Sequence, residues 1–235
     1  MNLLCIDTSG PVAGVALMED GVIRYEAMAV NAFTHSQSML PMVEEADTRT
    51  GLTVRNTDYF AAVVGPGSFT GVRIGVAAAK GFAWGAELPC CGVSTLAAMA
   101  VGLGVWQGYV CPVMDARRSQ VYNALFHVDC GKYTRIREDR AISLQELGED
   151  VKNLSEPVFL VGDGSVLCYN ALSGMVPGLV LPQEARMHQR AAGVALEAER
   201  LLKAGGSFPG EALVPNYLRL SQAERERNEK LMQNK

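Results

Sequence analysis

One stretch of the sequence, residues 59–87, restricts the fold more than any other. It opens with the short apolar run Tyr-Phe-Ala-Ala-Val-Val, which is typical of a buried strand. A glycine-rich turn follows at 65–71, and then an apolar helix over 71–87 whose interior charges are Arg73 and Lys80. Two charges are too few to define a solvated face, so we expect both sides of this helix to be covered.

Small residues recur along this helix at helical spacing, at Gly71, Gly75, Ala78 or Ala79, and Ala86. Each glycine inside a helix costs about 1 kcal/mol relative to alanine, so a close neighbour must compensate. Either a second helix of the same domain or a helix of a partner protein packs there. A membrane is disfavoured, because the run is shorter than about 20 residues and carries two charges.

The turn at 65–71 also raises the question of phosphate binding. Ser68 or Thr70 is expected to cap the helix, and free backbone N–H groups at a helix N-terminus bind anions. The turn lacks the Lys-Ser/Thr of a P-loop and the glycine spacing of a dinucleotide fingerprint, and Pro66 has no N–H to donate. The turn alone is therefore a weak phosphate site.

Composition restricts the classes of function. The chain has 235 residues, of which 49% are hydrophobic and 20% charged, and its formal net charge is -4. These values are typical of a globular protein with a substantial core. Before the C-terminal tail no Lys/Arg cluster alternates with aromatic residues, which disfavours strong autonomous binding of nucleic acid. If the protein serves a nucleic acid, we expect a partner to help.

The N-terminus and the cysteines point to one compartment. Residues 1–7 have no basic region, too short an apolar run for a signal peptide, and an acidic residue. The six cysteines form no C-x-x-C pair and lie mostly in apolar segments. We therefore expect a cytoplasmic protein with reduced core thiols and no membrane association.

The order of predicted elements repeats once. The first half reads as three strands, a helix, a strand, a helix, a strand and a helix, and a second group of strands begins near residue 109. We predict an α/β fold of two lobes with a ligand crevice between them. The predicted parts are an N-terminal lobe (1–104), a reduced C-terminal lobe with the final helix (105–220) and a charged, solvated or frayed tail (221–235).

Several polar residues follow predicted strands and could face a nucleotide or a metal-bound phosphate. These weak candidates are Asp7, Thr8, Ser9, Asp115, Gly162 and Gly164. All six are also ordinary turn residues, and this structural explanation stays open. The three histidines lack the spacing of a local metal pair, so no metal site is expected. A Ser-His-Asp triad stays open, although no G-x-S-x-G motif supports it.

Four motifs together resemble the TsaB family, also called YeaZ, over most of the chain. They are Ile-Asp-Thr-Ser at 6–9, Gly-Pro-Gly-Ser-Phe-Thr-Gly-Val-Arg-Ile-Gly at 65–75, Asp-Ala-Arg at 115–117 and Pro-Asn-Tyr-Leu-Arg at 215–219. The resemblance implies a two-lobed actin-like ATPase fold of the Hsp70/sugar-kinase type. It also implies a role in forming N6-threonylcarbamoyladenosine at position 37 of tRNA.

The family resemblance further implies partners and the absence of catalysis. Members of this family pair with a TsaD-type subunit, which transfers the threonylcarbamoyl group, and a TsaE-type ATPase assists. The catalytic sister carries an H-x-x-x-H metal motif, and the matching positions here are Thr95 and Met99. Neither side chain replaces imidazole on iron or zinc, so the metal site is expected to be lost.

The resemblance also implies an interface, because the two subunits of the family join through the helix at 71–87 and the one beginning near His35. The expected interface residues are His35, Met39, Met42, Phe69, Gly71, Arg73, Gly75, Ala78, Ala79 and Phe82. With Gly75 in this interface, Gly75→Leu is expected to spare the fold and weaken partner binding.

We therefore predict a non-catalytic scaffold or activator subunit, which meets tRNA only through its complex. It has no cofactor of its own, and ATP or ADP is expected only in the complex with its partners. The alternatives are an autonomous small-metabolite kinase or ATPase and a metallopeptidase-like protein. The sequence leaves open whether the isolated chain is a monomer or a homodimer.

Overall fold

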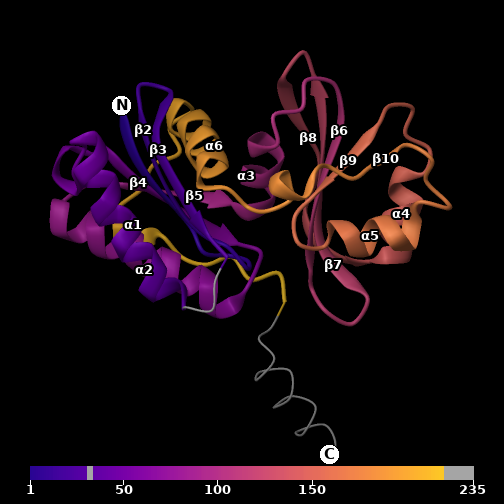
Figure 1. The fold of residues 1–235 in the computed structure, drawn as a ribbon, viewed down its shortest axis with the longest axis horizontal. Coiled ribbons are helices and arrows are strands. Elements are labelled where there is room, and N and C mark those ends of the chain that lie inside the picture. Colours follow the sequence, from indigo (N-terminus) through magenta and orange to yellow (C-terminus); the bar gives the residue numbers. More distant parts are fainter. Residues whose placement is uncertain (31–33, 220–235) are drawn as a thin grey trace, which may run out of the picture.

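The computed structural model describes residues 1–30 and 34–219, which form two lobes with one five-stranded sheet each. The predicted tail at 221–235 lies outside the described residues. The first sheet has the order β3-β2-β1-β4-β5, and α1 and α2 cover one of its faces (Figure 1). The elements of this half are β1 (Asn2–Asp7), β2 (Ala13–Glu19), β3 (Val22–Ala29), α1 (His35–Thr50), η1 (Val54–Asn56), β4 (Tyr59–Gly65), α2 (Phe69–Ala86), β5 (Cys90–Ser94) and α3 (Thr95–Gly102).

The second half repeats this topology with shorter helices. Its sheet has the order β8-β7-β6-β9-β10, so that β6 to β10 take the places that β1 to β5 have in the first sheet. The helices α4 and α5 have 8 residues each, against 16 and 18 in α1 and α2. The elements are β6 (Gly108–Asp115), β7 (Gln120–Asp129), β8 (Lys132–Ser143), α4 (Leu144–Val151), β9 (Val158–Val161), α5 (Ser165–Leu172), β10 (Leu179–Val180), η2 (Glu184–Arg186), α6 (Ala191–Lys203) and η3 (Gly210–Ala212).

The central strand, turn and helix form as the sequence predicts. β4 is buried between β1 and β5 and pairs parallel with both, which suits its continuous apolar sequence. Ser68 is the N-cap of α2, since its Oγ accepts a hydrogen bond from the Gly71 N–H at 3.2 Å. The helix begins at Phe69, two residues before the predicted start.

The last helix of each half packs on the sheet of the other half. α6 contributes Ala191, Val194, Ala195 and Ala198 to the core of the first sheet. α3 packs most of its apolar residues on β6 and β7, contributes Ala98 to the core of the first sheet and contacts α6 (Figure 1). The predicted boundary at residue 104 is therefore wrong for these two helices. Sequence periodicity identifies the buried face of a helix but not the sheet that covers it.

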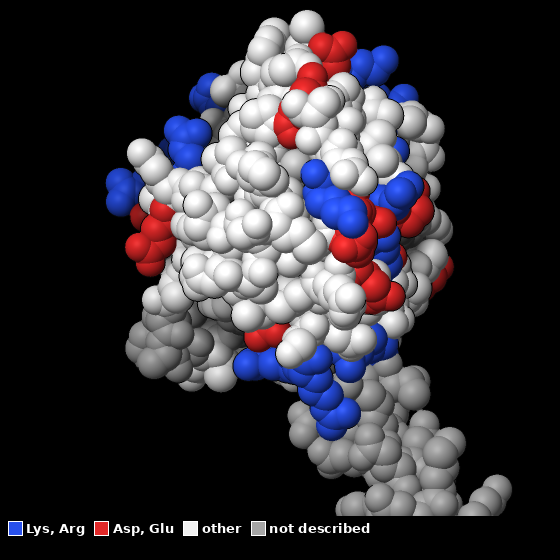
Figure 2. Space-filling model, turned by 90° about the vertical axis from the view of Figure 1, so that its right-hand side faces the viewer, with Lys and Arg blue, Asp and Glu red and all other residues white. Residues whose placement is uncertain are grey.

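Two surface properties bear on partners. Among the described residues, no helix has the length and apolar character needed to cross a bilayer. The face of the second lobe in Figure 2 has a broad uncharged centre, and charged side chains of both signs lie toward its rim. This face therefore does not present the dense positive patch that autonomous nucleic-acid binding requires.

Candidate functional site

A cleft of about 510 Å³ lies between the two lobes. Five segments line it: the loop after β1, the turn before α2, the turn between β6 and β7, the turn between β9 and α5, and the chain at 216–219. Of the predicted site residues, Ser9, Phe69 and Asp115 line the cleft, and Asp163, which the sequence analysis did not select, lines it too. The predicted interlobe crevice is therefore present.

Asp7 ends β1 behind the wall of this cleft and is only 2% exposed. Its Oδ1 accepts hydrogen bonds from the Ser9 N–H at 2.9 Å and the Ser9 hydroxyl at 2.6 Å. Within the described part of the chain, its Oδ2 is buried without a hydrogen-bond partner. Burial raises the pKa of Asp7, against the lowering effect of the Ser9 hydrogen bonds and the nearby His35. Asp7 is thus a buried carboxyl with a raised pKa near the cleft.

Thr8 faces away from the cleft. Its hydroxyl donates a hydrogen bond to the Gly71 carbonyl at 2.7 Å, and the side chain is fully buried against α2. The prediction that Thr8 faces a nucleotide is therefore wrong, because alternate side chains of an extended segment point to opposite sides. Thr8 instead anchors α2 to β1.

The second lobe contributes a pair of acidic residues. Asp115 Oδ1 accepts a hydrogen bond from the Arg117 N–H at 2.7 Å, and Asp163 Oδ1 accepts one from the Asp115 N–H at 3.3 Å. Burial is the main cause that raises the pKa of Asp163. Asp7 and Asp163 thus approach the cleft region from different lobes.

The turn that carries Asp115 has an unusual backbone. Arg117, Arg118 and Ser119 all have positive φ values, of 64°, 57° and 54°. A left-handed conformation costs about 1–2 kcal/mol for each residue other than glycine. The residue types did not indicate this conformation, because glycine, asparagine or aspartate usually occupies such positions. The turn is therefore strained where it borders the cleft.

The helix α2 turns its predicted ridge inward. Gly71, Gly75 and Ala79 are buried, and a Cβ on Gly75 would lie 2.7 Å from Thr8 Oγ1 and 3.5 Å from Ile6 Cγ2. These small residues let α2 approach β1 of the same chain. Their assignment to a partner interface is therefore wrong, and so is that of Met39, which is 3% exposed in the core under α1.

The opposite face of α2 is open to solvent. Arg73, Ala77, Gly81, Trp84 and Gly85 are exposed on it, and Trp84 is 87% exposed. A Cβ on Gly81 or Gly85 would have no neighbour within 4 Å. Of these five residues, Arg73 belongs to the predicted interface set and the other four do not. Spacing identifies rows of small residues, but a helix with so few charges does not indicate which row is buried.

The other predicted interface residues are partly accessible. His35 Nε2 lies 2.9 Å from the Gly10 carbonyl oxygen, and the Phe82 ring stacks on Phe60. Their part in a partner interface stays a prediction, together with that of the rest of the set: Met42, Phe69, Arg73 and Ala78. On α1, Leu40 is a large exposed apolar residue, at 48%.

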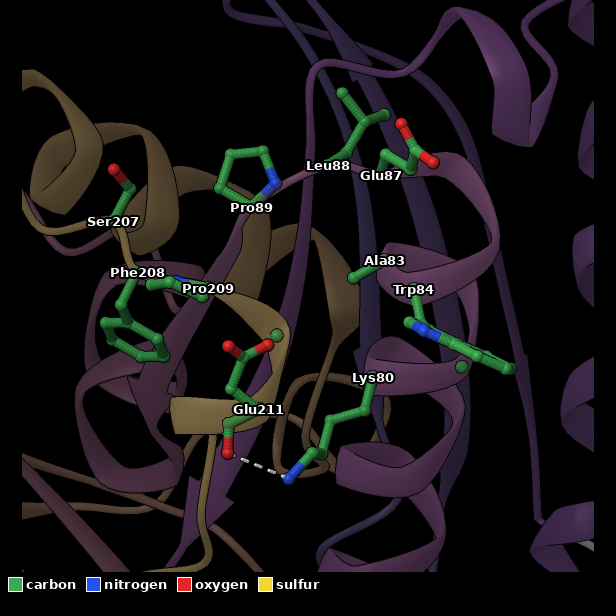
Figure 3. A pocket seen from close by; sticks show the side chains of 12 residues that line it. Lys80, Ala83, Trp84, Glu87, Leu88, Pro89, Ser207, Phe208, Pro209 and Glu211 are labelled. Carbon is green, nitrogen blue, oxygen red and sulfur yellow. Dashed lines mark hydrogen bonds between the residues drawn. The ribbon is translucent and has the colours of Figure 1, made fainter.

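A second cavity, of about 800 Å³, borders the C-terminal half of α2. Lys80 and Ala83 form one wall, and Phe208 and Pro209 form the other (Figure 3). Lys80 Nζ donates a hydrogen bond to the Glu211 carbonyl at 3.1 Å and so joins the two walls. The ring of Trp84 points away from the 207–211 segment in Figure 3. This groove thus continues the exposed face of α2.

Comparison with known proteins identifies the family. A family model described as "TsaD: tRNA N6-adenosine threonylcarbamoyltransferase" matches residues 29–226. The "tRNA threonylcarbamoyladenosine biosynthesis protein TsaB" of Bacillus subtilis strain 168 is 30% identical over 224 residues, which cover 95% of this chain and 96% of that protein. The chain belongs to the TsaB family. The resemblance inferred from the four motifs is confirmed.

Solved structures agree with this assignment. A Pseudomonas aeruginosa protein described as similar to the peptidase YeaZ has 26% identity and a TM-score of 0.76, over 93% of this chain and 99% of that one. The ethanolamine utilization protein EutJ of Carboxydothermus hydrogenoformans has 14% identity and a TM-score of 0.50, over 83% of this chain and 88% of that one, which shows the fold alone. The predicted two-lobed actin-like fold is confirmed.

Two glycines predicted to face a nucleotide have a role within the TsaB fold of this chain. Gly162 has a φ of 110°, and a Cβ there would overlap the Val113 carbonyl oxygen of β6. A Cβ on Gly164 would lie 3.2 Å from the same oxygen. Close packing of the β9–α5 turn on β6 therefore explains both glycines, and their contact with a nucleotide stays a prediction.

The peptidase alternative requires a serine paired with a histidine, and Ser9 and His35 do not form such a pair beside the interlobe cleft. Ser9 donates its hydroxyl proton to Asp7, and His35 Nε2 contacts the Gly10 carbonyl instead of Ser9. Thr95 and Met99, which match the metal-binding positions of the sister family, are both buried on α3. The described residues contain no group of three His, Cys, Asp or Glu side chains that could hold a metal ion.

Proposed function

We propose that this chain is a non-catalytic subunit that works with a TsaD-type transferase in forming N6-threonylcarbamoyladenosine in tRNA. The observation that carries the proposal is the similarity to Bacillus subtilis TsaB over 95% of the chain. The cleft supports this proposal, because the Ser9 hydroxyl is hydrogen-bonded to the buried carboxyl of Asp7 rather than to a histidine.

The partner meets this chain through the exposed face of α2 and the adjoining surface of α1. Leu40 and Trp84 are the large exposed apolar side chains of these two helices. Ala77, Gly81 and Gly85 flank Trp84 with little side-chain volume, which lets a helix of the partner approach closely. Exposed tryptophan beside a groove is typical of an interface anchor.

Nucleotide and RNA enter through the assembled complex. A TsaE-type ATPase assists the pair, ATP or ADP is bound only when the partners are present, and tRNA contacts are made jointly in the cytoplasm. The net charge of -4 supports this division, since a chain with that charge attracts phosphates poorly on its own.

A second candidate is an autonomous ATPase or small-metabolite kinase. The buried Oδ2 of Asp7, which has no hydrogen-bond partner in the described chain, favours a polar ligand or cation at the end of β1. Against it, the β6–β7 turn carries Arg117 and Arg118 where a phosphate loop needs glycine for close backbone approach.

Reconstitution separates these two functions. The purified chain is assayed for ATP hydrolysis and for tRNA modification by nucleoside mass spectrometry, first alone and then with the TsaD-type subunit, the TsaE-type ATPase and the adenylate-forming enzyme. We expect modified adenosine only in the full mixture, and none when this chain is omitted. Robust ATP turnover by the chain alone would favour the kinase, and modification without this chain would refute the subunit role.

A further inference from the structure

Residues 213–219, which we call the strap, run from the first lobe across the mouth of the interlobe cleft. Leu213 is buried in the core beneath α2, which fixes one end of the strap. The Asn216 N–H donates a hydrogen bond to the Val64 carbonyl at 2.6 Å, beside the turn that leads into α2. The strap and both lobes together line the cleft.

The middle of the strap is held on the first turns of α2. The Tyr217 ring stacks on Phe69 with a centroid distance of 4.7 Å. The Arg73 guanidinium lies over the same Phe69 ring, with its Cζ 3.8 Å from the ring centroid. Arg73 Nε also donates a hydrogen bond to the Tyr217 hydroxyl at 2.7 Å. This cluster of one arginine and two rings sits at an exposed part of the helix. Arg73 therefore belongs both to the exposed face of α2 and to the support of the strap.

The end of the strap is attached to the second lobe. Arg219 Nη1 donates a hydrogen bond to the Ala116 carbonyl at 2.7 Å. That carbonyl immediately precedes the strained residues Arg117, Arg118 and Ser119. Hydrogen bonds from a charged donor are stronger than neutral ones, so this contact supports a turn that has an unfavourable backbone.

We propose that the strap is a latch that holds the interlobe cleft closed, with Arg219 as its catch on the β6–β7 turn and Tyr217 as its link to α2. Loss of the Arg219 contact loosens the strained turn and opens the cleft. A partner that covers α2 at Arg73 competes for the guanidinium that supports Tyr217 and so releases the latch. This last step rests on the proposed function, because it requires the partner to dock on α2.

Hydrogen–deuterium exchange of the full chain tests the latch without a partner. The amides of Ala116, Arg117 and Gln120 are protected by hydrogen bonds within the turn, so peptides covering 114–121 report its opening. We expect Arg219→Ala to speed exchange there at least tenfold. Arg219→Lys keeps a charged donor and is expected to stay within about threefold of the wild type.

The matched control is Arg117→Ala. The Arg117 side chain is 86% exposed, and its ion pair with Asp115 Oδ2 is long at 3.8 Å and therefore weak. We expect its loss to change exchange less than twofold. Unchanged exchange at 114–121 in Arg219→Ala, with a normal thermal transition, would refute the latch. If Arg219→Ala unfolds, Tyr217→Phe replaces it as the test, because it keeps the ring and removes the hydrogen bond to Arg73. We expect this variant to raise exchange in the strap and in 114–121. No rise in 114–121 would also refute the latch.

Adding the TsaD-type subunit tests the coupling. We expect protection to appear over residues 73–85 while exchange at 114–121 rises at least threefold. Protection on α2 with slower or unchanged exchange in the turn would refute the coupling. No protection on α2 in a complex that does form would contradict the proposed docking face, and the Arg219→Ala comparison would still decide the latch.

Discussion

Two glycines of α2, at 75 and 81, provide a sharp test of how this helix is oriented. A Cβ on Gly75 would lie 2.7 Å from Thr8 Oγ1, whereas one on Gly81 would have no neighbour within 4 Å. Both substitutions to alanine gain about 1 kcal/mol of helix propensity. At Gly75 the gain is opposed by overpacking of about 1–3 kcal/mol and by loss of the Thr8 hydrogen bond to Gly71, which is worth about 1 kcal/mol.

We therefore expect Gly75→Ala to lower the free energy of unfolding by about 1–3 kcal/mol and Gly81→Ala to raise it by about 1 kcal/mol. For a chain of this size each kcal/mol corresponds to about 2–4 °C in Tm. Urea unfolding followed by tryptophan fluorescence and far-UV circular dichroism measures both variants. If Gly75→Ala were as stable as Gly81→Ala, the inward orientation of Gly75 would be wrong. The expectation that Gly75→Leu spares the fold is replaced accordingly, because a larger side chain meets the same hydroxyl.

Three further changes test other parts of the structure. Trp84→Ala is expected to leave Tm unchanged and weaken heterodimer affinity at least tenfold, about 1.4 kcal/mol, in titration calorimetry, with the second exposed tryptophan, Trp106, as the matched control. Glu26 accepts hydrogen bonds from Arg190 and from the Ala192 N–H at the start of α6, so Glu26→Ala is expected to cost about 1–3 kcal/mol in urea unfolding, and an unchanged midpoint would contradict this role. Burial makes the pKa of Asp7 higher in the folded chain than in the unfolded chain. The protonated Asp7 carboxyl therefore contributes its full stability below the unfolded-state pKa, and this contribution is lost as pH rises through the folded-state pKa. Asp7→Asn is therefore expected to raise Tm at pH 7, with a gain that shrinks toward pH 4, and a gain independent of pH would refute the assignment.

Local patterns predicted most elements because their signals are local. Alternating and continuous apolar runs, bounded by turn residues, located β1 to β3 and the buried strand β4. The end of β1 at Asp7 and of β6 at Asp115 followed from the same patterns. The repeat of strand order in the two sheets confirms the predicted duplication.

The errors concern relations between distant segments. Residue spacing placed Gly71 and Gly75 on one row of α2 but could not decide which row faces β1, since that depends on residues such as Thr8 more than sixty positions away. The same limit applies to the strap. The stacking of Tyr217 on Phe69 joins segments separated by more than 140 residues, and no periodicity reports such a contact.

The crossing of α3 and α6 makes the two sides of the molecule unequal. A Cβ on Gly102 would lie 3.2 Å from the Cα of Gly193, so the two helices touch through their backbones and each is buried on the sheet of the opposite lobe. Close-packed backbones resist sliding, because even one added methyl group meets a neighbour. At the cleft mouth the strap carries only one charged hydrogen bond to the second lobe in the contacts described here, from Arg219. Relative motion of the lobes is therefore expected to pivot at the helix crossing and to open at the strap, which is the side that the exposed face of α2 can influence.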